Sequence, residues 1–277
     1  MPSLATRFGR NRAELRSSTP LANEAIKAFA PSIFAEEPHG SRSARYSYIP
    51  TSKVLDGLRG EGFEPFMVAQ CRTRDETRKD FTKHLIRFRH ATQIEAREET
   101  QEIILINSHD GTSSYQLLAG CFRFACANGL IVGEQTADIR VPHKGDVQGT
   151  VIEGAFRVLS DFERVADNIH GMKAITLDQG EQLALGRAAL ALRYDEDKAP
   201  IEPEQVIETR RRADRADDLW SVFNRVQEST IRGGQTGYSQ DGKRRVRTRE
   251  ITGIDQGVKL NRALWVLAEE MRRLKAA

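Results

Sequence analysis

The sequence predicts an α+β protein with a small antiparallel sheet and a helical C-terminal half. Three apolar segments of strand length follow one another between residues 63 and 108, separated by charged or turn-forming residues. Beyond residue 145, apolar residues recur mainly at helical spacing. We therefore expect one domain over residues 25–277, in which a strand–strand–strand–helix core at 25–145 precedes a mainly helical part at 146–277.

The composition is that of a folded, mildly basic protein. The chain has 277 residues, of which 39% are hydrophobic and 29% are charged, so it can bury a core. The formal net charge of +3 is only a weak indication of a polyanionic partner. Cys71, Cys121 and Cys126 form no CxxC pair, so we expect reduced thiols in a cytoplasmic protein. No apolar run approaches the ~18 residues of a membrane span, and no secretory signal is visible.

The N-terminal segments are predicted to be an arm and two short helices. Residues 1–24 are polar and arginine-rich, which is typical of a flexible basic arm. A short helix follows and is stopped by Pro31. The hydroxyls of Thr51 and Ser52 can cap a second helix, which ends at a glycine near residue 60.

The predicted sheet has strands at residues 63–74, 81–91 and 101–108. The continuous apolar run of the third segment indicates a central strand buried on both faces. Residues 114–130 are expected to form a buried helix, because their apolar residues fit a helical stripe and Asn128-Gly129 suits a helix C-cap.

The C-terminal half is predicted to be helical apart from one linker and one loop. An acidic, proline-bearing linker occupies residues 195–205, and a glycine-rich basic loop occupies residues 233–250. A capping box is expected at Thr176 and Gln179. The predicted helices cover residues 151–169, 176–194, 210–230 and 257–274.

The first candidate site is a basic hairpin made by the first two strands. Side chains two apart share a face of a strand, so polar and basic residues of both strands are predicted to align as one ridge. Arginine contacts phosphate with a planar fork of donors, so the ridge fits a DNA backbone. The alternative is a solvated sheet face without a ligand. The ridge consists of Gln70, Arg72, Arg74, Lys83, Arg87 and Arg89, of which the five cations are the predicted DNA-binding residues.

The second candidate site is the segment KRRVRTR at residues 243–249. Five of its seven residues are basic, which suits sequence-independent nucleic-acid binding by counterion release. The alternative is a surface loop whose cations pair with Asp241 and Glu250. The run at 210–212 is weaker, because acidic residues on the same predicted helix can neutralise it. The five cations are Lys243, Arg244, Arg245, Arg247 and Arg249.

No catalytic centre is predicted. The segment NSHDG at 107–111 contains a serine, a histidine and an aspartate, but adjacent side chains point in different directions, so a turn explains it better. No cluster has metal-ligand spacing, and RGGQTG lacks the lysine of a P-loop. We therefore expect no enzymatic activity, no metal and no cofactor. His84 and His90 are interpreted as ordinary sheet residues.

Several segments resemble phage- and plasmid-related proteins of domain-of-unknown-function family 932. They include NSHDGTSSYQLLAGCFRFACANGLIVGE, DLWSVFNRVQESTIRGGQ, LNRALW and RYSYIPTSKVLDGLRGEGFEPF. The resemblance covers roughly residues 25–270. It implies a protein of a bacterial mobile element and carries no established activity.

A second resemblance points toward DNA recombination. YSYIPTSKVLDGLRGEGFEPFMVAQ is similar to the opening of phage essential-recombination-function proteins, and the predicted strand–strand–strand–helix order resembles Rad52-type single-strand annealing proteins. The resemblance implies that a hairpin and an adjoining basic groove hold single-stranded DNA in a ring or helical homo-oligomer. It covers about a third of the chain, and the order of elements does not fix function.

These observations together predict sequence-independent binding of single-stranded DNA, with strand annealing for a phage or plasmid as a further expectation. Tyr46 and Tyr48 are expected either to stack on bases or to pack in the core. The alternative function is a protein-binding module that counters a host defence system, whose basic patches would meet an acidic partner. A nuclease-like enzyme is disfavoured because no carboxylate cluster is visible.

Overall fold

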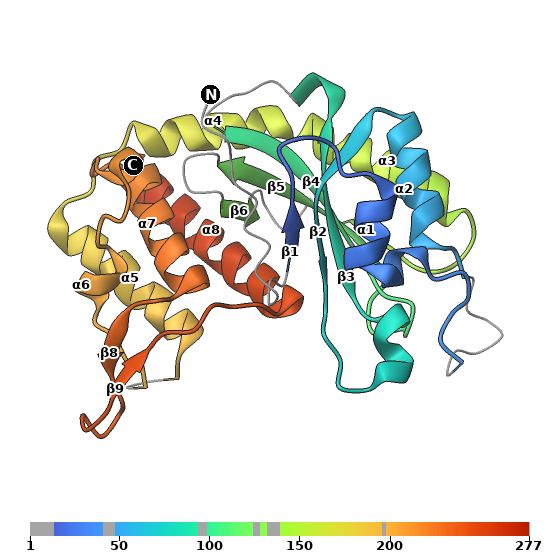
Figure 1. Ribbon diagram of the computed structural model, residues 1–277. Helices are drawn as coiled ribbons and strands as arrows, with labels where there is room; N and C mark the ends of the chain where they lie inside the picture. Colours follow the sequence, from blue (N-terminus) through green and yellow to red (C-terminus); the bar gives the residue numbers. More distant parts are fainter. Residues whose placement is uncertain are drawn as a thin grey trace. The chain divides into compact units, whose positions relative to one another are not determined.

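A computed structural model describes residues 14–40, 48–93, 99–123, 128–131, 139–195 and 198–276. Its main sheet has the strand order β1–β2–β3–β4–β5–β6, with β7 paired to β5, and β8 and β9 form a separate two-stranded sheet (Figure 1). The strands are β1 (Glu14–Arg16), β2 (Phe63–Gln70), β3 (His84–His90), β4 (Glu99–Asn107), β5 (Tyr115–Arg123), β6 (Asn128–Ile131), β7 (Ile139–Val141), β8 (Thr236–Tyr238) and β9 (Arg245–Arg247).

Most α-helices follow the last strand of the main sheet. Short 3-10 helices lie at Pro31–Phe34, Glu76–Phe81, Ala91–Gln93 and Arg212–Asp214. The α-helices are α1 (Asn23–Phe29), α2 (Thr51–Gly60), α3 (Val147–Ser160), α4 (Phe162–Lys173), α5 (Gln179–Arg193), α6 (Pro203–Val206), α7 (Leu219–Arg232) and α8 (Ile254–Ala276). The predicted combination of an antiparallel sheet with helices is therefore confirmed, although the sheet has more strands than the three predicted.

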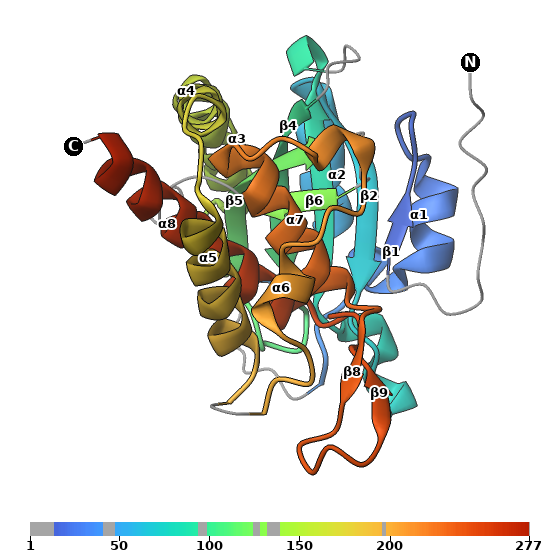
Figure 2. The ribbon, with the colours of Figure 1, turned by 90° about the vertical axis from the view of Figure 1, so that its left-hand side faces the viewer.

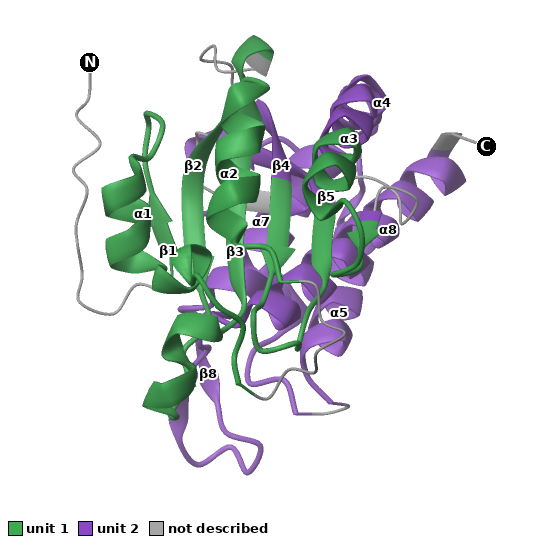
Figure 3. Ribbon diagram, turned by 90° about the vertical axis from the view of Figure 1, so that its right-hand side faces the viewer, with its two compact units in different colours: residues 1–92, 104–117, 140–154 green, residues 93–103, 118–139, 155–277 purple. Residues whose placement is uncertain are grey.

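The chain forms two compact units that are interleaved in sequence (Figure 3). Unit 1 comprises residues 1–92, 104–117 and 140–154, and unit 2 comprises residues 93–103, 118–139 and 155–277. Strands β4 and β5 and helix α3 each contribute residues to both units. The single-domain organisation stays a prediction.

Unit 1 is built on antiparallel pairing of β1, β2 and β3, with Val68 opposite both Leu15 and Ile86. Figure 3 shows α1 and α2 over one face of the strands of this unit. Helix α2 buries Val54, Leu55 and Leu58, which recur on one helical face as predicted. β1 lies within the segment expected to be a flexible arm.

Unit 2 is organised around α7, of which twelve of fourteen residues are buried. Phe223 links the two tryptophan-bearing helices: its ring stacks at 5.6 Å from Trp220 of α7 and meets Trp265 of α8 edge-on at 6.0 Å. Both tryptophans are buried. The two helices therefore share one aromatic core.

The helix predicted at residues 114–130 is wrong. This segment contains β5 and β6, which pair antiparallel with Arg123 opposite Asn128. β5 is buried on nearly all of its positions, and such a strand shows the same apolar run as a buried helix. Asn128-Gly129 begins a strand instead of ending a helix, so the Rad52-type order of elements is not confirmed.

The long helix predicted at residues 210–230 begins only at Leu219. Asp218 caps α7 by accepting a hydrogen bond from the Ser221 backbone N–H at 2.9 Å. Upstream, Asp214 forms a buried ion pair with Arg123, and Arg211 makes a bidentate pair with Glu228. The side chains of Arg211 and Asp214 are therefore paired with residues outside the stretch before α7 and do not neutralise each other along a helix.

Two other helical predictions differ in detail. The single helix expected at 151–169 is split into α3 and α4 near Asp161. The capping box of α5 is formed by Asp178 and Glu181 and not by the predicted Thr176 and Gln179. The three helices α3, α4 and α5 nevertheless overlap the segments whose apolar spacing predicted helical structure.

Candidate nucleic-acid interface

Strands β8 and β9 form an antiparallel ribbon with one covered face and one exposed face. The outer face carries two cross-strand pairs, Tyr238 with Arg245 and Thr236 with Arg247, and all four residues are exposed. Gly237 lies on the inner face and is buried. This alternation follows from the two-residue period of a strand and aims both arginines away from the covered face.

The inner face is held against the chain segment at Pro200. The Tyr238 backbone N–H donates to the Pro200 carbonyl at 2.9 Å. A Cβ added to Gly237 would lie 1.6 Å from the Pro200 oxygen, so only glycine permits this approach. The ribbon is thus fixed in one orientation within unit 2.

The base of the ribbon is fixed directly after α7. Gly233 and Gly234 have positive φ angles of 60° and 85°, which turn the chain from the helix into β8. Gly234 donates from its backbone N–H to the Thr248 carbonyl at 2.8 Å. The Arg193 guanidinium donates to the carbonyls of Thr230 in α7 and Arg249 after β9, so α5 is joined to the segments on either side of the ribbon (Figure 2).

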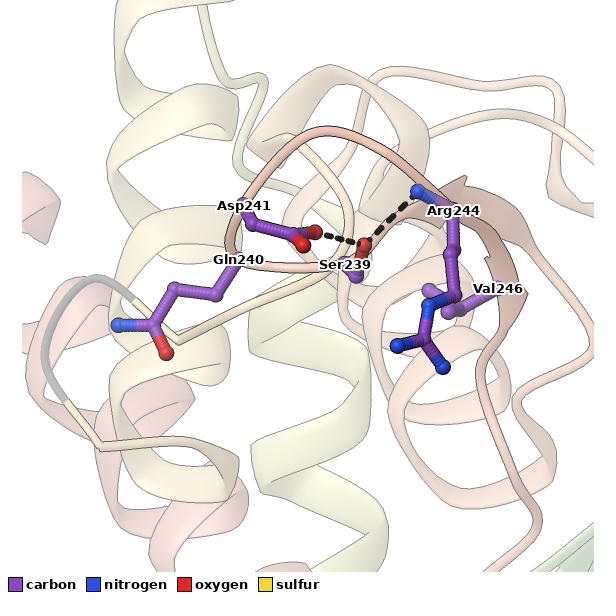
Figure 4. A pocket seen from close by; sticks show the side chains of 5 residues that line it. All are labelled: Ser239, Gln240, Asp241, Arg244 and Val246. Carbon is purple, nitrogen blue, oxygen red and sulfur yellow. Dashed lines mark hydrogen bonds between the residues drawn. The ribbon is translucent and has the colours of Figure 1, made fainter.

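Hydrogen bonds within the turn between the two strands hold its acidic residue, Asp241 (Figure 4). The Asp241 carboxylate accepts hydrogen bonds from Ser239 Oγ at 2.5 Å and from the Lys243 backbone N–H at 3.1 Å. The hydrogen bond from Ser239, followed by that from Lys243, lowers the pKa of Asp241 below its ordinary value. Ser239 Oγ in turn accepts from the Arg244 backbone N–H at 3.0 Å.

The turn also borders an open hollow, lined by Ser239, Gln240, Asp241, Arg244 and Val246 (Figure 4). Apart from Val246, these lining side chains are polar or charged. The hollow is open to solvent and does not enclose a small molecule. An extended ligand that lies along the ribbon therefore fits this surface better than a small molecule bound in the hollow.

The basic residues of the ribbon are available to a ligand. Their side chains are all exposed, and within the described part of the chain none has a carboxylate within 4.0 Å. Asp241 serves the turn, and Glu250 forms no ion pair with them, so the neutralising pairs considered from the sequence are absent among these residues. The five are Lys243, Arg244, Arg245, Arg247 and Arg249.

The basic ridge predicted on β2 and β3 is wrong in its register. Gln70 pairs with His84, so it shares the sheet face of His84 and not that of Arg87 and Arg89. β2 ends at Gln70, which leaves Arg72 and Arg74 in the following loop, where both are exposed.

The predicted DNA-binding residues of this hairpin also differ in how much of each side chain is exposed. Arg87 and Arg89 are each only 4% exposed, and Lys83 is half-buried. The Arg89 guanidinium lies 4.2 Å from the centre of the Phe66 ring, in a cation–π contact. β3 lies between β2 and β4 and is covered on both faces, so the alternation of charge in its sequence does not mark a solvent face.

Of the two tyrosines considered for base stacking, only Tyr48 lies among the described residues. Tyr46 lies outside the described residues. Tyr48 is half-buried, donates from its hydroxyl to the Ala35 carbonyl and meets the ring of His109 edge-on at 5.0 Å. Of the two roles left open for Tyr48, packing is the one that its contacts support.

A buried polar cluster in unit 1 was not predicted. Its centre is the hydroxyl of Thr51, the first residue of α2, and four polar atoms converge on this oxygen. All five residues are fully buried. The four atoms are His84 Nε2 at 2.9 Å, Asn107 Nδ2 at 3.0 Å, His109 Nε2 at 3.1 Å and Tyr115 Oη at 3.2 Å.

The cluster extends through two further contacts. His84 Nδ1 lies 2.9 Å from Ser32 Oγ, and His143 Nε2 lies 3.1 Å from Asn107 Oδ1. The members are far apart in sequence, so only folding reveals them; His84 among the apolar residues of β3 was the one local signal. His109 belongs to this cluster and not only to the turn that follows it.

The electrostatics of the cluster favour neutral imidazoles. Burial lowers the pKa of His84 from 6.5 to about 3, against a smaller raising effect of the Thr82 carbonyl. Burial, and then the proximity of His84 and His143, lowers the pKa of His109 to about 2. The two buried rings are held by the central hydroxyl, since each places its Nε2 within 3.1 Å of Thr51 Oγ1. His84 also has partners for its Nδ1, whereas the buried Nδ1 of His109 has none among the described residues.

The described part of the chain contains neither a metal-binding cluster nor a membrane-spanning helix. Within those residues, no group of three or more histidine, cysteine, aspartate or glutamate side chains is arranged to hold a metal ion. No helix among them is long and apolar enough to cross a bilayer. The exposed basic ribbon is the candidate functional surface among the described residues.

Comparison with known proteins identifies the family. Residues 38–265 match the model of the domain of unknown function DUF932. The chain is 48% identical to UPF0380 protein YfjQ of Escherichia coli (strain K12), and also 48% identical to UPF0380 protein YafZ of the same strain. Each match spans 271 residues and covers 98% of both chains. No solved structure matches the chain. On this evidence the chain belongs to the DUF932 family.

Proposed function

We propose that this protein binds single-stranded DNA without sequence preference, through the β8–β9 ribbon. The observation that carries the proposal is the set of five exposed cations on the ribbon and its flank, without a carboxylate within 4.0 Å among the described residues. Cations that are not neutralised within the protein release counterions when they meet phosphates. The anchored inner face supports this role because it keeps the arginines of the outer face in a fixed array.

The proposed mode of binding is backbone contact. Guanidinium groups contact phosphate oxygens through two parallel hydrogen bonds, and such contacts carry no sequence information. Arg72 and Arg74 are exposed in the loop after β2 and are proposed as additional phosphate contacts. The buried Arg87 and Arg89 contribute to the core of unit 1 and are not part of this proposal.

Strand annealing on a ring or helical homo-oligomer, in the service of a phage or plasmid, is the further part of the proposal. The similarity of the segment around α2 and β2 to recombination proteins supports it, whereas the strand found at residues 115–123 removes the predicted helix from that similarity. An oligomer would bring several ribbons to one strand and raise the effective affinity. Annealing of complementary oligonucleotides is the assay for this part.

The test of DNA binding compares two double variants that each lose two positive charges. Arg245→Ala with Arg247→Ala removes the outer arginines of the ribbon, and Lys27→Ala with Lys53→Ala is the control, because both lysines are exposed on helices of unit 1. Affinity for a labelled oligothymidylate is measured over a series of salt concentrations. The ribbon variant is expected to bind more weakly and to flatten the logarithmic salt dependence by about 1.4, since each phosphate contact on a single strand contributes roughly 0.7.

Two results would contradict the proposal. Equal loss of affinity in both variants would show that net charge, and not the ribbon, controls binding. Absence of binding by the unmodified protein at low salt would remove DNA as the ligand and favour the alternative of an acidic protein partner at the same cations.

A further inference from the structure

Tyr238 is placed on the outer face of the ribbon without a role inside the protein. It is 61% exposed, which is high for an aromatic residue in a strand. Among the described residues its side chain has no hydrogen-bond or ring partner, and only its backbone N–H is used, by Pro200. Nothing in the packing of unit 2 therefore accounts for an aromatic ring at this position.

The neighbours of Tyr238 are those of a nucleic-acid contact. Arg245 lies directly opposite it across the ribbon, and the next pair on the same face is Thr236 with Arg247. Residues two apart in a strand are separated by about 7 Å, so the backbone of Arg247 lies one step along the ribbon from that of Arg245. The Nε of Arg247 donates to the Gly234 carbonyl at 2.9 Å, which holds this guanidinium at the base of the ribbon. The outer face thus combines one aromatic surface with two cations.

We infer that Tyr238 stacks on an unpaired base and makes the ribbon selective for single strands over duplexes. The inference rests on the proposed function, because the arginines must first hold the phosphates. Every base has a π-face, so stacking on tyrosine is tolerant of sequence. The bases of a duplex already stack on one another, which leaves only its phosphates for the ribbon. Tyr238 replaces Tyr48, whose ring packs inside unit 1, as the candidate for stacking.

The test uses Tyr238→Leu, which keeps an apolar side chain but removes the ring, and Tyr238→Phe, which keeps the ring. Three labelled probes are compared: an oligothymidylate, an abasic oligodeoxyribose phosphate of equal length, and a duplex. We expect Tyr238→Leu to bind the oligothymidylate about tenfold more weakly, in line with stacking energies measured for other proteins. Tyr238→Phe is expected to retain most of the affinity. Neither variant is expected to change binding of the abasic probe or the duplex.

The salt dependence separates stacking from loss of the ribbon. Tyr238→Leu removes no cation, so its logarithmic salt slope should equal that of the unmodified protein, whereas the arginine variant flattens the slope. If the unmodified protein binds the oligothymidylate but Tyr238→Leu binds it equally well, the stacking role is overturned and the proposed function stands. Equal affinity of the unmodified protein for the abasic probe overturns it as well. If the unmodified protein binds none of the probes at low salt, both proposals fail together.

Discussion

Arg72 and Arg87 belong to the same predicted basic ridge but differ in burial. Arg72 is exposed in a loop, and Arg87 is 4% exposed inside β3. Replacing Arg72 by alanine should change the free energy of unfolding by no more than about 0.5 kcal/mol. Arg87→Ala should lower it by about 1–3 kcal/mol, because the side chain stem packs in the core and buried partners lose their contacts. Urea denaturation of both variants measures the difference.

Arg72→Ala serves as the control for Arg87→Ala. Both substitutions remove one arginine, so an effect of net charge would appear in both. Equal and small changes in the urea midpoint would show that Arg87 is not part of the core, and would restore it as a candidate phosphate contact.

His84 and His109 make the stability of unit 1 depend on pH. Both are buried with pKa values of about 3 and about 2, whereas an unfolded chain protonates them near 6.5. The unfolded state therefore binds more protons below pH 6.5. The stabilisation is complete above that pH and is lost as the pH falls toward 3, by up to about 2.7 kcal/mol per pH unit for two histidines.

The measurement is the urea midpoint at several pH values between 5.5 and 7.5, a range in which carboxylates contribute little. His170→Gln, which removes an exposed imidazole, is the control variant. His84→Asn should make the pH dependence of the midpoint shallower. A midpoint that stays constant across this range would mean that the two rings are not buried as neutral groups.

Among the secondary-structure elements, those with one clear periodicity were predictable. α2 and α8 each show a helical apolar stripe, and β2 shows strand-like residues between turn signals. The structure of residues 114–130 was not predictable. A strand buried on both faces lacks the alternation of apolar and polar residues that would distinguish it from a buried helix. Here pairing with neighbouring strands decided the structure, and a local pattern does not contain that information.

The candidate site also has features that the local sequence predicts and features that depend on the fold. The basic composition of residues 243–249 is local and was predicted, whereas the close approach of Gly237 to Pro200 joins two segments that are far apart in sequence. Tyr238 was missed because nothing local separates an exposed tyrosine from a buried one. The alternation of arginines in β3 misled the prediction, because both faces of this strand are buried in the fold although its sequence alternates.

The docking of the ribbon depends on Gly237. Gly237→Ala places a Cβ against the Pro200 oxygen, where the backbone must move, so we expect the ribbon to open locally while the rest of unit 2 stays folded. Trypsin cleaves after lysine and arginine, and cleavage within residues 243–249 should therefore become faster. Mass spectrometry of a timed digest identifies the cut sites.

A second glycine provides the control for this prediction. Gly253→Ala introduces the same methyl group where the nearest atom lies 3.9 Å away, so it should not change the digest. Unchanged cleavage in Gly237→Ala would show that the ribbon does not need its contact with Pro200.

For the molecule as a whole, α8 is expected to be essential to unit 2. It contributes Trp265, Leu264 and Ala268 to the core, and all three are fully buried. Loss of one buried aromatic side chain typically costs ~3–5 kcal/mol, against a total stability of ~5–15 kcal/mol for a domain. Truncation before Gly257 should therefore give an insoluble or unfolded protein, as judged by soluble yield and circular dichroism.

A shorter truncation separates loss of the core from loss of the chain end. Removing residues 274–277 deletes Leu274, which is 79% exposed, and the exposed ion pair of Lys275 with Glu181, which contributes little. This variant should melt within a few degrees of the full chain and should keep its DNA affinity. The ribbon emerges directly from α7, whose aromatic core α8 completes, so DNA binding and the fold of unit 2 should be lost together in the longer truncation. A soluble 1–256 fragment with an unaltered melting temperature would show instead that α8 is an accessory to an independently folded core.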